Sequence, residues 1–402
     1  MQHSVSKEKS LKGGKELISI QYLRGFAAIG VVIYHIILSI HHFDDLHPKY
    51  TSSAWASGVD IFFIISGFIM LYITCLQPMG AIEFLRSRLL RISPLYWMAT
   101  IIMFMMPLIS RTIGWSSSMN PIQLLSSLFF VGGVKGVGFV SGFPVYRAGW
   151  TINYEIFFYF LFSIGLLLRD LTRTVVFVAV TIGALCLFGA IMPHLGSVQA
   201  FYTSDIQFEF VFGLLIASVY VRGVRLPHLL NVTLVLLGLS AIWIGAHEDH
   251  RVIYKGVPAA FVVIGLVGLN RVLERAPARL FKLLGDASYS IYLTHLFTVG
   301  VLDMLARKAF ASSHGAGLKA SGLFHVVYLG VGLAASAGVG VAVFWVVERP
   351  LHRWSRTLVS RRPSGGPIQR EALGAAAAQL EPDHLGLECI RRGEGSLSAG
   401  RD

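Results

Sequence analysis

The chain has 402 residues, of which 54% are hydrophobic and only 14% are charged, and its net charge is +12. A soluble globular protein typically carries about 25% charged residues, so the composition excludes a soluble enzyme and a disordered chain alike. Three cysteines are too few for a disulfide scaffold. The basic residues form short clusters between apolar runs, as orientation signals do in membrane proteins, so we do not expect nucleic acid as a partner. The composition predicts an all-α polytopic membrane protein.

Ten apolar stretches have about the 20 residues that a spanning helix needs. A further run, 121–131, is apolar but short, and we expect a half-helix or re-entrant segment there. The ten predicted spans are 19–41, 54–75, 93–110, 150–168, 174–192, 206–221, 228–246, 254–270, 288–306 and 323–347.

The positions of Lys and Arg predict how the chain is oriented. These residues are more numerous in the segments that face the cytoplasm if the N-terminus lies there, so both termini are expected to be cytoplasmic. We divide the chain into a basic N-terminus (1–17), a transmembrane domain (18–350) and a cytoplasmic tail (351–402). The tail is rich in Gly, Ser, Arg and Pro and lacks apolar periodicity, which is typical of disorder.

The first predicted span contains two ionisable residues, which are expensive within a membrane and often functional. Arg24 and His35 are 11 residues apart. This separation is about three helical turns, so they share one face about 16 Å apart along the axis. A permanent cation and a deeper titratable base would suit an anionic ligand. Alternatively, Arg24 snorkels to the interface and His35 is a hydrogen-bonded core histidine.

The second predicted span places Phe62, Phe63 and Ser66 on one stripe, because residues three and four apart are neighbours on a helix. Gly67 follows, and a small residue there lets a ligand or another helix approach closely. Ordinary small-residue packing explains this stripe equally well. The carboxylate of Asp60 needs a partner, and Arg24 or His35 are the candidates.

Three arginines precede the third predicted span: Arg86, Arg88 and Arg91. Arg88 and Arg91 are three residues apart, and two guanidiniums on one face can bind a phosphate group. The alternative is a positively charged anchor at the membrane surface. Pro94 is expected to open the following helix in its first turn.

Later spans contribute further polar residues. Glu155 lies one turn inside the fourth span, where it could orient a histidine or pair with a structural arginine. Asp205 and Glu209 share a face of the sixth span. In the ninth, Ser288, Tyr292 and His295 form one stripe, which is more typical of anchoring than of catalysis.

Two other patterns are set aside. The glycine-rich run 132–138 is not followed by the GK[ST] residues of a phosphate-binding loop. The cluster His41, His42, Asp44, Asp45 and His47 lacks a defined metal-ligand spacing, so we expect no metal site.

Taken in chain order, these segments resemble integral-membrane acyltransferase family three, the bacterial sugar O-acyltransferases, and are most similar to its exopolysaccharide-production (ExoZ-like) branch. Each motif alone is weak, and the order of five over residues 18 to about 350 carries the resemblance. The five are Arg24 and His35 at R-x10-H, Phe62-Phe63-Ile64-Ile65-Ser66-Gly67 as FFxxSG, Arg88-Leu89-Leu90-Arg91 as RxxR, Gly149-Trp150-Thr151-Ile152-Asn153-Tyr154-Glu155 and the run from Leu284 to His295.

The resemblance implies an enzyme of the bacterial cytoplasmic (inner) membrane, embedded in lipid. Cytoplasmic acetyl-CoA would be its donor co-substrate, with no permanently bound cofactor, and a polysaccharide or undecaprenyl-linked sugar hydroxyl its acceptor. A succinyl or longer acyl donor and a lipid or peptidoglycan acceptor remain open within this reading. A transporter or flippase for a glycan is the alternative outside it, although no internal repeat supports a transporter.

The site follows from the resemblance and the chemistry together. Arg88 and Arg91 would bind the CoA phosphates, with Arg24 deeper and Phe62, Phe63 and Gly67 alongside. His35 would be the general base, because its ordinary pKa near 6.5 suits proton exchange at neutral pH. Glu155 or Asp60 would fix its tautomer, and Ser66 would steady the oxyanion. A transient acyl-enzyme on His35 or Ser66 remains open.

Overall fold

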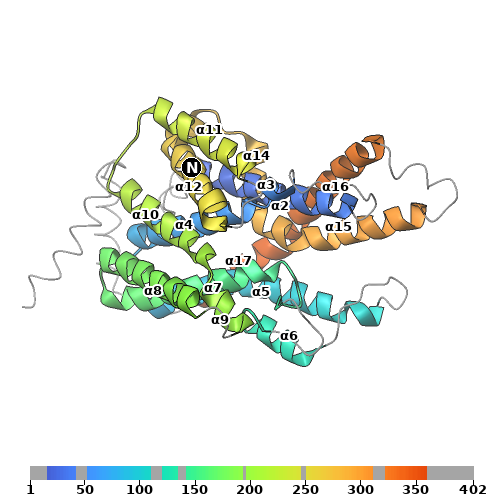
Figure 1. Cartoon of the computed structure of the whole chain (residues 1–402), viewed down its shortest axis with the longest axis horizontal. Coiled ribbons are helices and arrows are strands. Elements are labelled where there is room, and N and C mark those ends of the chain that lie inside the picture. The colour runs from blue at the N-terminus through green and yellow to red at the C-terminus, as the bar shows by residue number, and fades with distance from the viewer. Residues whose placement is uncertain are drawn as a thin grey trace, which may run out of the picture.

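The structure, a computed structural model, describes residues 16–41, 52–109, 120–134, 142–192, 196–245, 250–310 and 322–359. Every regular element within these ranges is helical, which confirms the predicted all-α class (Figure 1). The long elements in chain order are α2 (Ile18–His41), α4 (Gly58–Leu76), α5 (Ala81–Ile109), α7 (Gly149–Gly165), α8 (Leu171–Ile191), α10 (Phe208–Val221), α11 (His228–Ile244), α12 (Val257–Gly268), α15 (Ser288–Phe310) and α16 (Gly322–Val343). The short ones are α3 (Ser52–Trp55), α6 (Pro121–Leu128), η1 (Leu166–Leu168), α9 (Ser197–Tyr202), η2 (Asp205–Gln207), η3 (Val252–Gly256), α13 (Asn270–Arg275), α14 (Arg279–Asp286), η5 (Phe344–Glu348) and α17 (Arg349–Val359).

Eight helices in the described part of the chain are long and apolar enough to cross a membrane. Two shorter apolar helices, His228–Ile244 and Val252–Gly268, fall on the seventh and eighth predicted spans. The chain is thus a multi-pass membrane protein by the length and composition of its helices, and the count of ten spans stays a prediction. The short apolar run contains α6, whose N-terminus is capped by the Asn120 side chain accepting from the backbone N–H groups of Ile122 and Gln123.

Helix α2 occupies the middle of the bundle, where it contacts α4, α14, α15 and α16 (Figure 1). Its contact with α14 is close because glycines face each other: a Cβ added to Gly25 would lie 3.0 Å from the backbone nitrogen of Gly285. On the two flanks of the bundle, α11 packs along α12 and α15 along α16. This arrangement places the polar residues of α2 against several other helices at once.

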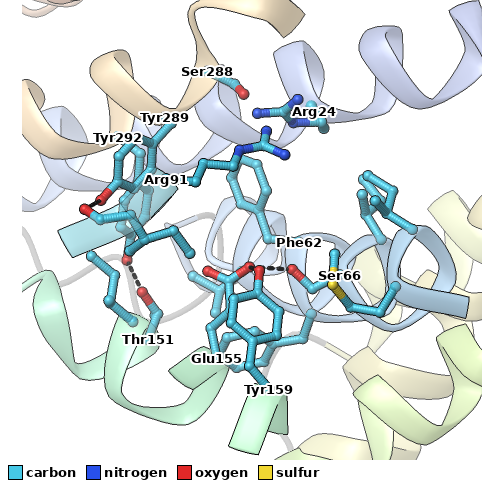
Figure 2. Close-up of a pocket in the computed structure, with 17 residues that line it drawn as sticks. Arg24, Phe62, Ser66, Arg91, Thr151, Glu155, Tyr159, Ser288, Tyr289 and Tyr292 are labelled. Atoms are coloured by element: carbon cyan, nitrogen blue, oxygen red, sulfur yellow. Dashed lines mark hydrogen bonds between the residues drawn. The ribbon is translucent and has the colours of Figure 1, made fainter. Parts of the chain in front are cut away.

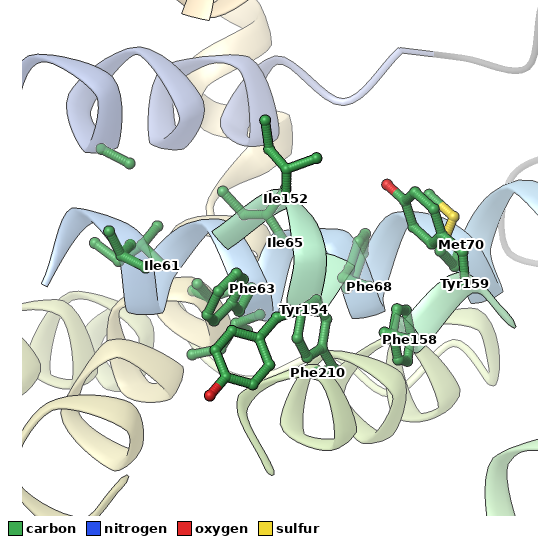
Figure 3. Packing of buried hydrophobic residues seen from close by; sticks show 14 of the residues in the cluster. Ile61, Phe63, Ile65, Phe68, Met70, Ile152, Tyr154, Phe158, Tyr159 and Phe210 are labelled. Carbon is green, nitrogen blue, oxygen red and sulfur yellow. The ribbon is translucent and has the colours of Figure 1, made fainter. Parts of the chain in front are cut away.

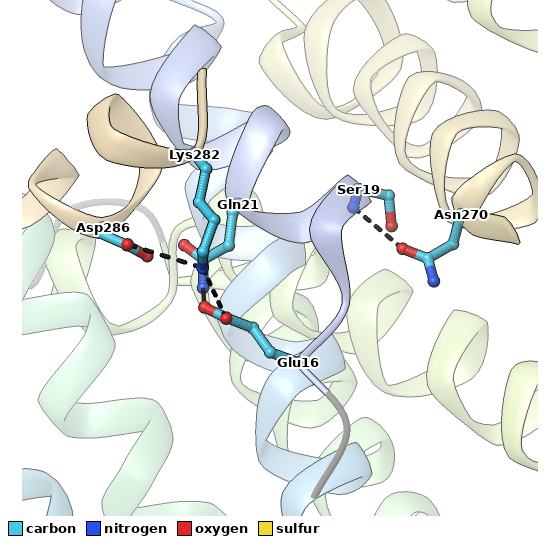
Figure 4. Close-up of polar contacts among 6 residues, drawn as sticks. All are labelled: Glu16, Ser19, Gln21, Asn270, Lys282 and Asp286. Carbon is cyan, nitrogen blue, oxygen red and sulfur yellow. Dashed lines mark hydrogen bonds and ion pairs between the residues drawn. The ribbon is translucent and has the colours of Figure 1, made fainter. Parts of the chain in front are cut away.

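Polar contacts fix the N-terminal end of α2 (Figure 4). The Lys282 ammonium on α14 lies 2.6 Å from a Glu16 carboxylate oxygen, and the Gln21 amide donates to the other Glu16 oxygen at 2.8 Å. The backbone N–H of Ser19 donates to the Asn270 side chain at 3.0 Å. These bonds tie α2 to α13 and α14 one to two turns before Arg24, which limits how far that residue can shift.

Helices α4 and α10 cross at two glycines. A Cβ at Gly67 would collide with the backbone of α10 at Phe210, and one at Gly213 would collide with the backbone of α4 at Ile64. Beside this crossing, the Phe210 ring packs on Phe63 with centroids 4.6 Å apart and on Phe158 at 4.5 Å (Figure 3). Gly67 therefore serves helix packing, because its Cα faces a neighbouring backbone and it does not line the pocket described below.

Helix α5 differs from the prediction, because Pro94 does not open a new helix. A single helix runs through it from Ala81 to Ile109 and carries the arginines in its first half. Proline removes one backbone N–H, and membrane bundles tolerate this loss when neighbouring groups satisfy the freed carbonyls. The Tyr289 hydroxyl donates to the backbone carbonyl of Ile92 at 2.6 Å, next to the proline.

The start of the predicted tail is helical, which the composition of the tail did not indicate. Helix α17 runs from Arg349 to Val359, so the first part of the predicted tail 351–402 is helical. The Ser355 hydroxyl is buried and donates to the carbonyl of His352 at 3.0 Å. Residues 360–402, like 1–15 at the other end, lie outside the described residues.

Candidate active site

A pocket lies between α2, α4, α5, α7 and α15 (Figure 2). It comprises about 780 Å³ of space not filled by atoms, open space at its mouth included. Polar side chains from all five helices reach it among apolar ones, which is typical of a substrate site. Its lining residues are Arg24, Val59, Phe62, Phe63, Ile65, Ser66, Ile69, Met70, Arg91, Ile92, Thr151, Ile152, Glu155, Tyr159, Ser288, Tyr289 and Tyr292.

Two guanidiniums form one side of this pocket. Arg24 from α2 and Arg91 from α5 lie next to each other, with the Ser288 hydroxyl on the same side (Figure 2). Across the described residues, neither arginine has a hydrogen bond or ion pair, and the buried Ser288 hydroxyl has no partner either. Both guanidiniums are partly exposed, and the carboxylates of Glu348, Asp286 and Glu155 act on Arg24 through space without forming an ion pair with it. The two adjacent cations are suited to an anionic ligand.

A carboxylate with two hydroxyl groups forms the opposite side. The Ser66 hydroxyl on α4 donates to the Glu155 carboxylate on α7 at 2.5 Å. The Tyr159 hydroxyl, one turn further along α7, donates to the same carboxylate oxygen. Glu155 therefore orients a serine rather than His35, so the expected contact between Glu155 and the histidine is not formed. Because the Ser66 hydroxyl donates its one proton to Glu155, its oxygen is left with lone pairs for contacts with other groups.

Phe62 and Tyr292 form an aromatic wall at another side of the pocket, with ring centroids 5.9 Å apart in an edge-to-face arrangement. The Tyr292 hydroxyl is held by Thr151 Oγ1 at 2.8 Å and by the Ala148 carbonyl at 3.1 Å. The Phe62 ring makes no hydrogen bond and is held by packing against buried apolar side chains of the bundle. We name these two rings the aromatic wall.

His35 lies beyond the aromatic wall and does not line the pocket. Its Nδ1 is 2.9 Å from the Val31 carbonyl of its own helix and 3.2 Å from Nε2 of His295 on α15. The His295 ring is fully buried and lies 5.7 Å from the Tyr292 ring, centroid to centroid. The expected single cavity joining Arg24 to His35 is therefore divided by the aromatic wall in this structure.

Asp60 has a partner that the sequence did not indicate. Its fully buried carboxylate accepts two hydrogen bonds from Arg251, at 2.9 Å from Nε and 2.8 Å from Nη2. The expected pairing with Arg24 or His35 is wrong, because Asp60 at the start of α4 meets the segment that precedes η3. Glu209 is also fully buried, whereas Asp205 is exposed. The two acidic residues predicted to share a helix face therefore differ in their access to solvent.

The two arginines of the predicted pair on α5 lie in different surroundings. Arg91 lines the pocket beside Arg24, but Arg88 is buried outside it. Arg88 Nε donates to the Ser87 hydroxyl at 3.3 Å, its guanidinium lies over the Phe84 ring, and its Nη1 has no partner in the described structure. Of the predicted pair Arg88 and Arg91, only Arg91 lines the pocket, and its neighbour there is Arg24.

Phe62, Phe63 and Ser66 all reach the pocket as the stripe on α4 predicted, whereas Gly67 does not. Tyr159 and Arg251 were missed from the sequence. Tyr159 follows Glu155 by four residues, a helical spacing that signals a shared face, whereas Arg251 had no local signal. His295 was noted but interpreted as an anchor.

The histidine-rich segment after His41 and the run 135–141 lie outside the described residues, so the structure does not address the metal-like cluster. Among the residues that are described, no three His, Cys, Asp or Glu side chains are grouped to hold a metal ion.

Comparisons with known proteins show the family to which the chain belongs. Residues 17–347 match a family described as an acyltransferase domain. The chain is 33% identical over 322 residues to the exopolysaccharide production protein ExoZ of Rhizobium meliloti (strain 1021), covering 79% of this chain and 95% of that protein. A comparison with solved structures finds no significant match. A family match over most of the chain, together with this relative, identifies this membrane protein as a member of acyltransferase family three and as an acyltransferase enzyme.

Proposed function

We propose that this enzyme transfers an acetyl group from acetyl-CoA to a hydroxyl group of an exopolysaccharide or of its lipid-linked sugar repeat unit. The name of the ExoZ relative supports the polysaccharide acceptor. The observation that carries the proposal is the unpaired Arg24–Arg91 pair facing a carboxylate-bound serine across one pocket. Membership of an acyltransferase family sets aside the transporter alternative.

The proposal includes an orientation in the bacterial inner membrane, with ten spans and both termini in the cytoplasm. Helix α2 then runs outward from Ile18, so Arg24 lies toward the cytoplasm and His35 toward the opposite side. The excess of Lys and Arg in the segments assigned to the cytoplasm supports this orientation. The donor would enter from the arginine side and the acceptor from the histidine side.

Arg24 and Arg91 would bind the phosphate groups of the donor. CoA carries several negative charges, and guanidiniums form strong charge-assisted hydrogen bonds with phosphate oxygens. The Ser288 hydroxyl, buried without a partner beside them, supplies an uncharged donor for the same ligand. The pantetheine arm would then lie along the apolar part of the lining and bring the thioester toward the aromatic wall.

His35 would act as general base. Its imidazole takes the proton of the sugar hydroxyl as the sugar oxygen attacks the thioester carbonyl. The C–S bond then breaks, and the departing CoA sulfur takes the proton back from the imidazolium. A route through an acyl-Ser66 intermediate is chemically open as well, because Glu155 is in place to accept the serine proton.

The aromatic wall must open for the thioester to meet His35. Tyr292 is held by two hydrogen bonds, whereas Phe62 is held by packing alone. We therefore assign the movement to the Phe62 side chain. A closed wall in the absence of acceptor would keep water away from the thioester and limit its hydrolysis.

The proposed function is tested with purified enzyme in lipid nanodiscs, radiolabelled acetyl-CoA and exopolysaccharide from a strain that lacks this gene. We expect label in the polysaccharide, released by mild alkali as acetate, and no label when heat-inactivated enzyme is used. Parallel reactions with succinyl-CoA, and with lipid or peptidoglycan acceptors, decide the donor and acceptor class. Absence of transfer from acetyl-CoA to any glycan would contradict the proposal.

A further inference from the structure

His35 and His295 form a pair of imidazoles from two different helices. His35 Nδ1 and His295 Nε2 are 3.2 Å apart, and the two ring centroids are 4.8 Å apart. Each ring also places its Nδ1 next to a backbone carbonyl: Val31 O at 2.9 Å for His35 and Tyr292 O at 2.6 Å for His295. His295 also has a hydrogen bond to the backbone of Ile291, one turn earlier on its own helix.

The two carbonyls decide where the protons lie. A carbonyl oxygen only accepts, so a hydrogen bond to it requires a proton on the facing nitrogen. Nδ1 of His295 therefore carries a proton that it donates to Tyr292 O, and the neutral ring has a bare Nε2. Nδ1 of His35 likewise carries a proton, which it shares between Val31 O and the bare Nε2 of His295. The only nitrogen left without a proton on neutral His35 is its Nε2.

Nε2 of His35 has no hydrogen-bond partner among the described residues, so its lone pair is free for a substrate proton. The bond to Val31 lies within α2 and cannot fix the ring relative to the other helices. His295 can, because its own position is fixed from α7: Tyr292, one turn before it, is hydrogen-bonded to Thr151 and Ala148. The chain of contacts thus runs from α7 through α15 to the imidazole on α2.

We propose that His295 is a positioning residue for His35: by accepting the Nδ1 proton of His35 from a second helix, it fixes the orientation of that ring relative to the neighbouring helices, while the Nδ1–H tautomer required by the Val31 carbonyl leaves Nε2 as the base. The inference rests on the proposed function for the role of His35, but the pairing itself is a structural claim. A second-helix partner that fixes the tautomer and orientation of a catalytic imidazole is a recurring device in acid–base catalysis.

The first test does not depend on activity. Enzyme labelled with ¹³C,¹⁵N-histidine is reconstituted in lipid bilayers, and the His35 ring signals are assigned by their loss in His35→Asn. Ring-carbon shifts distinguish the two neutral tautomers. We expect wild-type His35 as the Nδ1–H tautomer. An Nε2–H tautomer in the wild-type protein would overturn the proposal even if the enzyme transfers acetyl groups.

The second test compares two replacements of His295. In His295→Gln the side-chain oxygen can take the place of Nε2, so the His35 tautomer should persist and turnover should stay within a few-fold of wild type. His295→Phe fills the same space without an acceptor. The Val31 carbonyl should keep His35 in the Nδ1–H tautomer, but the ring loses its partner on α15, so we expect a fall in kcat of about 100-fold, with the KM for the donor unchanged.

The matched control is Ser39→Ala. Ser39 lies one turn beyond His35 on α2 and bonds Asp303 on α15 at 3.1 Å and Tyr328 on α16 at 2.9 Å, without touching His35. This variant loosens the same helix interface, and it should leave both the His35 tautomer and the turnover close to wild type. Wild-type turnover in His295→Phe, or equal loss of turnover in the Gln and Phe variants, would overturn the proposal. Absence of transfer in the wild type with the expected tautomers would instead contradict the proposed function alone.

Discussion

Arg24 on α2 and Arg91 on α5 lie side by side in one pocket although 67 positions separate them in the sequence (91 − 24), and no described acidic group pairs with either. Two partly exposed cations side by side repel each other in the empty protein, and a polyanion bound between them would relieve that repulsion. Under the proposed function, this relationship places the anion site in the gap between two helices rather than on one helix face.

The arginine pair predicts how donor binding depends on charge. Arg24→Ala or Arg91→Ala should raise the KM for acetyl-CoA roughly 10- to 100-fold, because a hydrogen bond to a charged group contributes about 1.5–3 kcal/mol. Arg88→Ala should change the KM much less, because Arg88 lies outside the lining, and the exposed Arg86→Ala is the control for surface charge. Steady-state kinetics at varied donor concentration measures this. A larger effect at Arg88 than at Arg91 would restore the RxxR pair as the phosphate site.

Glu155 and Ser66 are predicted to act as one unit. Glu155→Gln keeps an acceptor for the serine but cannot take its proton readily, so kcat should fall by about 100-fold. Ser66→Ala should cost a similar amount, and the double variant should be no worse than either single one, since coupled residues are not additive. The control is Ser163→Ala. Ser163 is a buried serine on α7, and in the described structure its hydroxyl donates to the Phe160 carbonyl. Fully additive losses would show that the two residues work separately.

Phe62 is predicted to control access of water to the thioester. Phe62→Ala shortens the aromatic wall, so hydrolysis of acetyl-CoA without an acceptor should rise relative to transfer. Release of free CoA without an acceptor, followed with a thiol reagent, measures hydrolysis, and label in the polysaccharide measures transfer. Phe158→Leu disturbs the aromatic packing on Phe210 without touching the pocket, and its ratio should match wild type. If hydrolysis in Phe62→Ala stays at the wild-type level, the wall does not protect the thioester.

The Asp60–Arg251 ion pair is predicted to stabilise the fold rather than to act on substrate. Arg251→Ala leaves a buried carboxylate unpaired and should lower the free energy of unfolding by about 3 kcal/mol. The pair Arg307–Asp303, with its arginine side chain 57% exposed, gives the comparison: Arg307→Ala should cost less than about 1 kcal/mol. Thermal unfolding in detergent measures both. Unchanged stability but lost turnover in Arg251→Ala would place this pair in the catalytic machinery.

The sequence predicted the features that depend on local periodicity. Apolar length located the helices, and the stripe on α4 brought Phe62, Phe63 and Ser66 to one pocket. Arg24 and His35 share a helix as predicted, yet they lie on different sides of an aromatic wall. The ring of Tyr292 comes from α15, so spacing along α2 carries no information about that division.

The contacts that the sequence did not predict all join distant helices. Asp60 meets Arg251, Ser66 meets Glu155, and His35 meets His295, with no spacing rule linking the members of each pair. Arg88 and Arg91 show the limit of a local rule as well. Three residues advance a helix by about 300°, so the two side chains point about 60° apart. One reaches the pocket while the other packs on Phe84.

The most direct measurement is acetyl transfer by His35→Ala in nanodiscs at saturating acetyl-CoA, compared with wild type. Because His35 lies behind the aromatic wall and outside the donor pocket, turnover should fall by at least about 100-fold while the donor still binds with wild-type affinity. Transfer at the wild-type rate by this variant would contradict the assignment of the imidazole as the base.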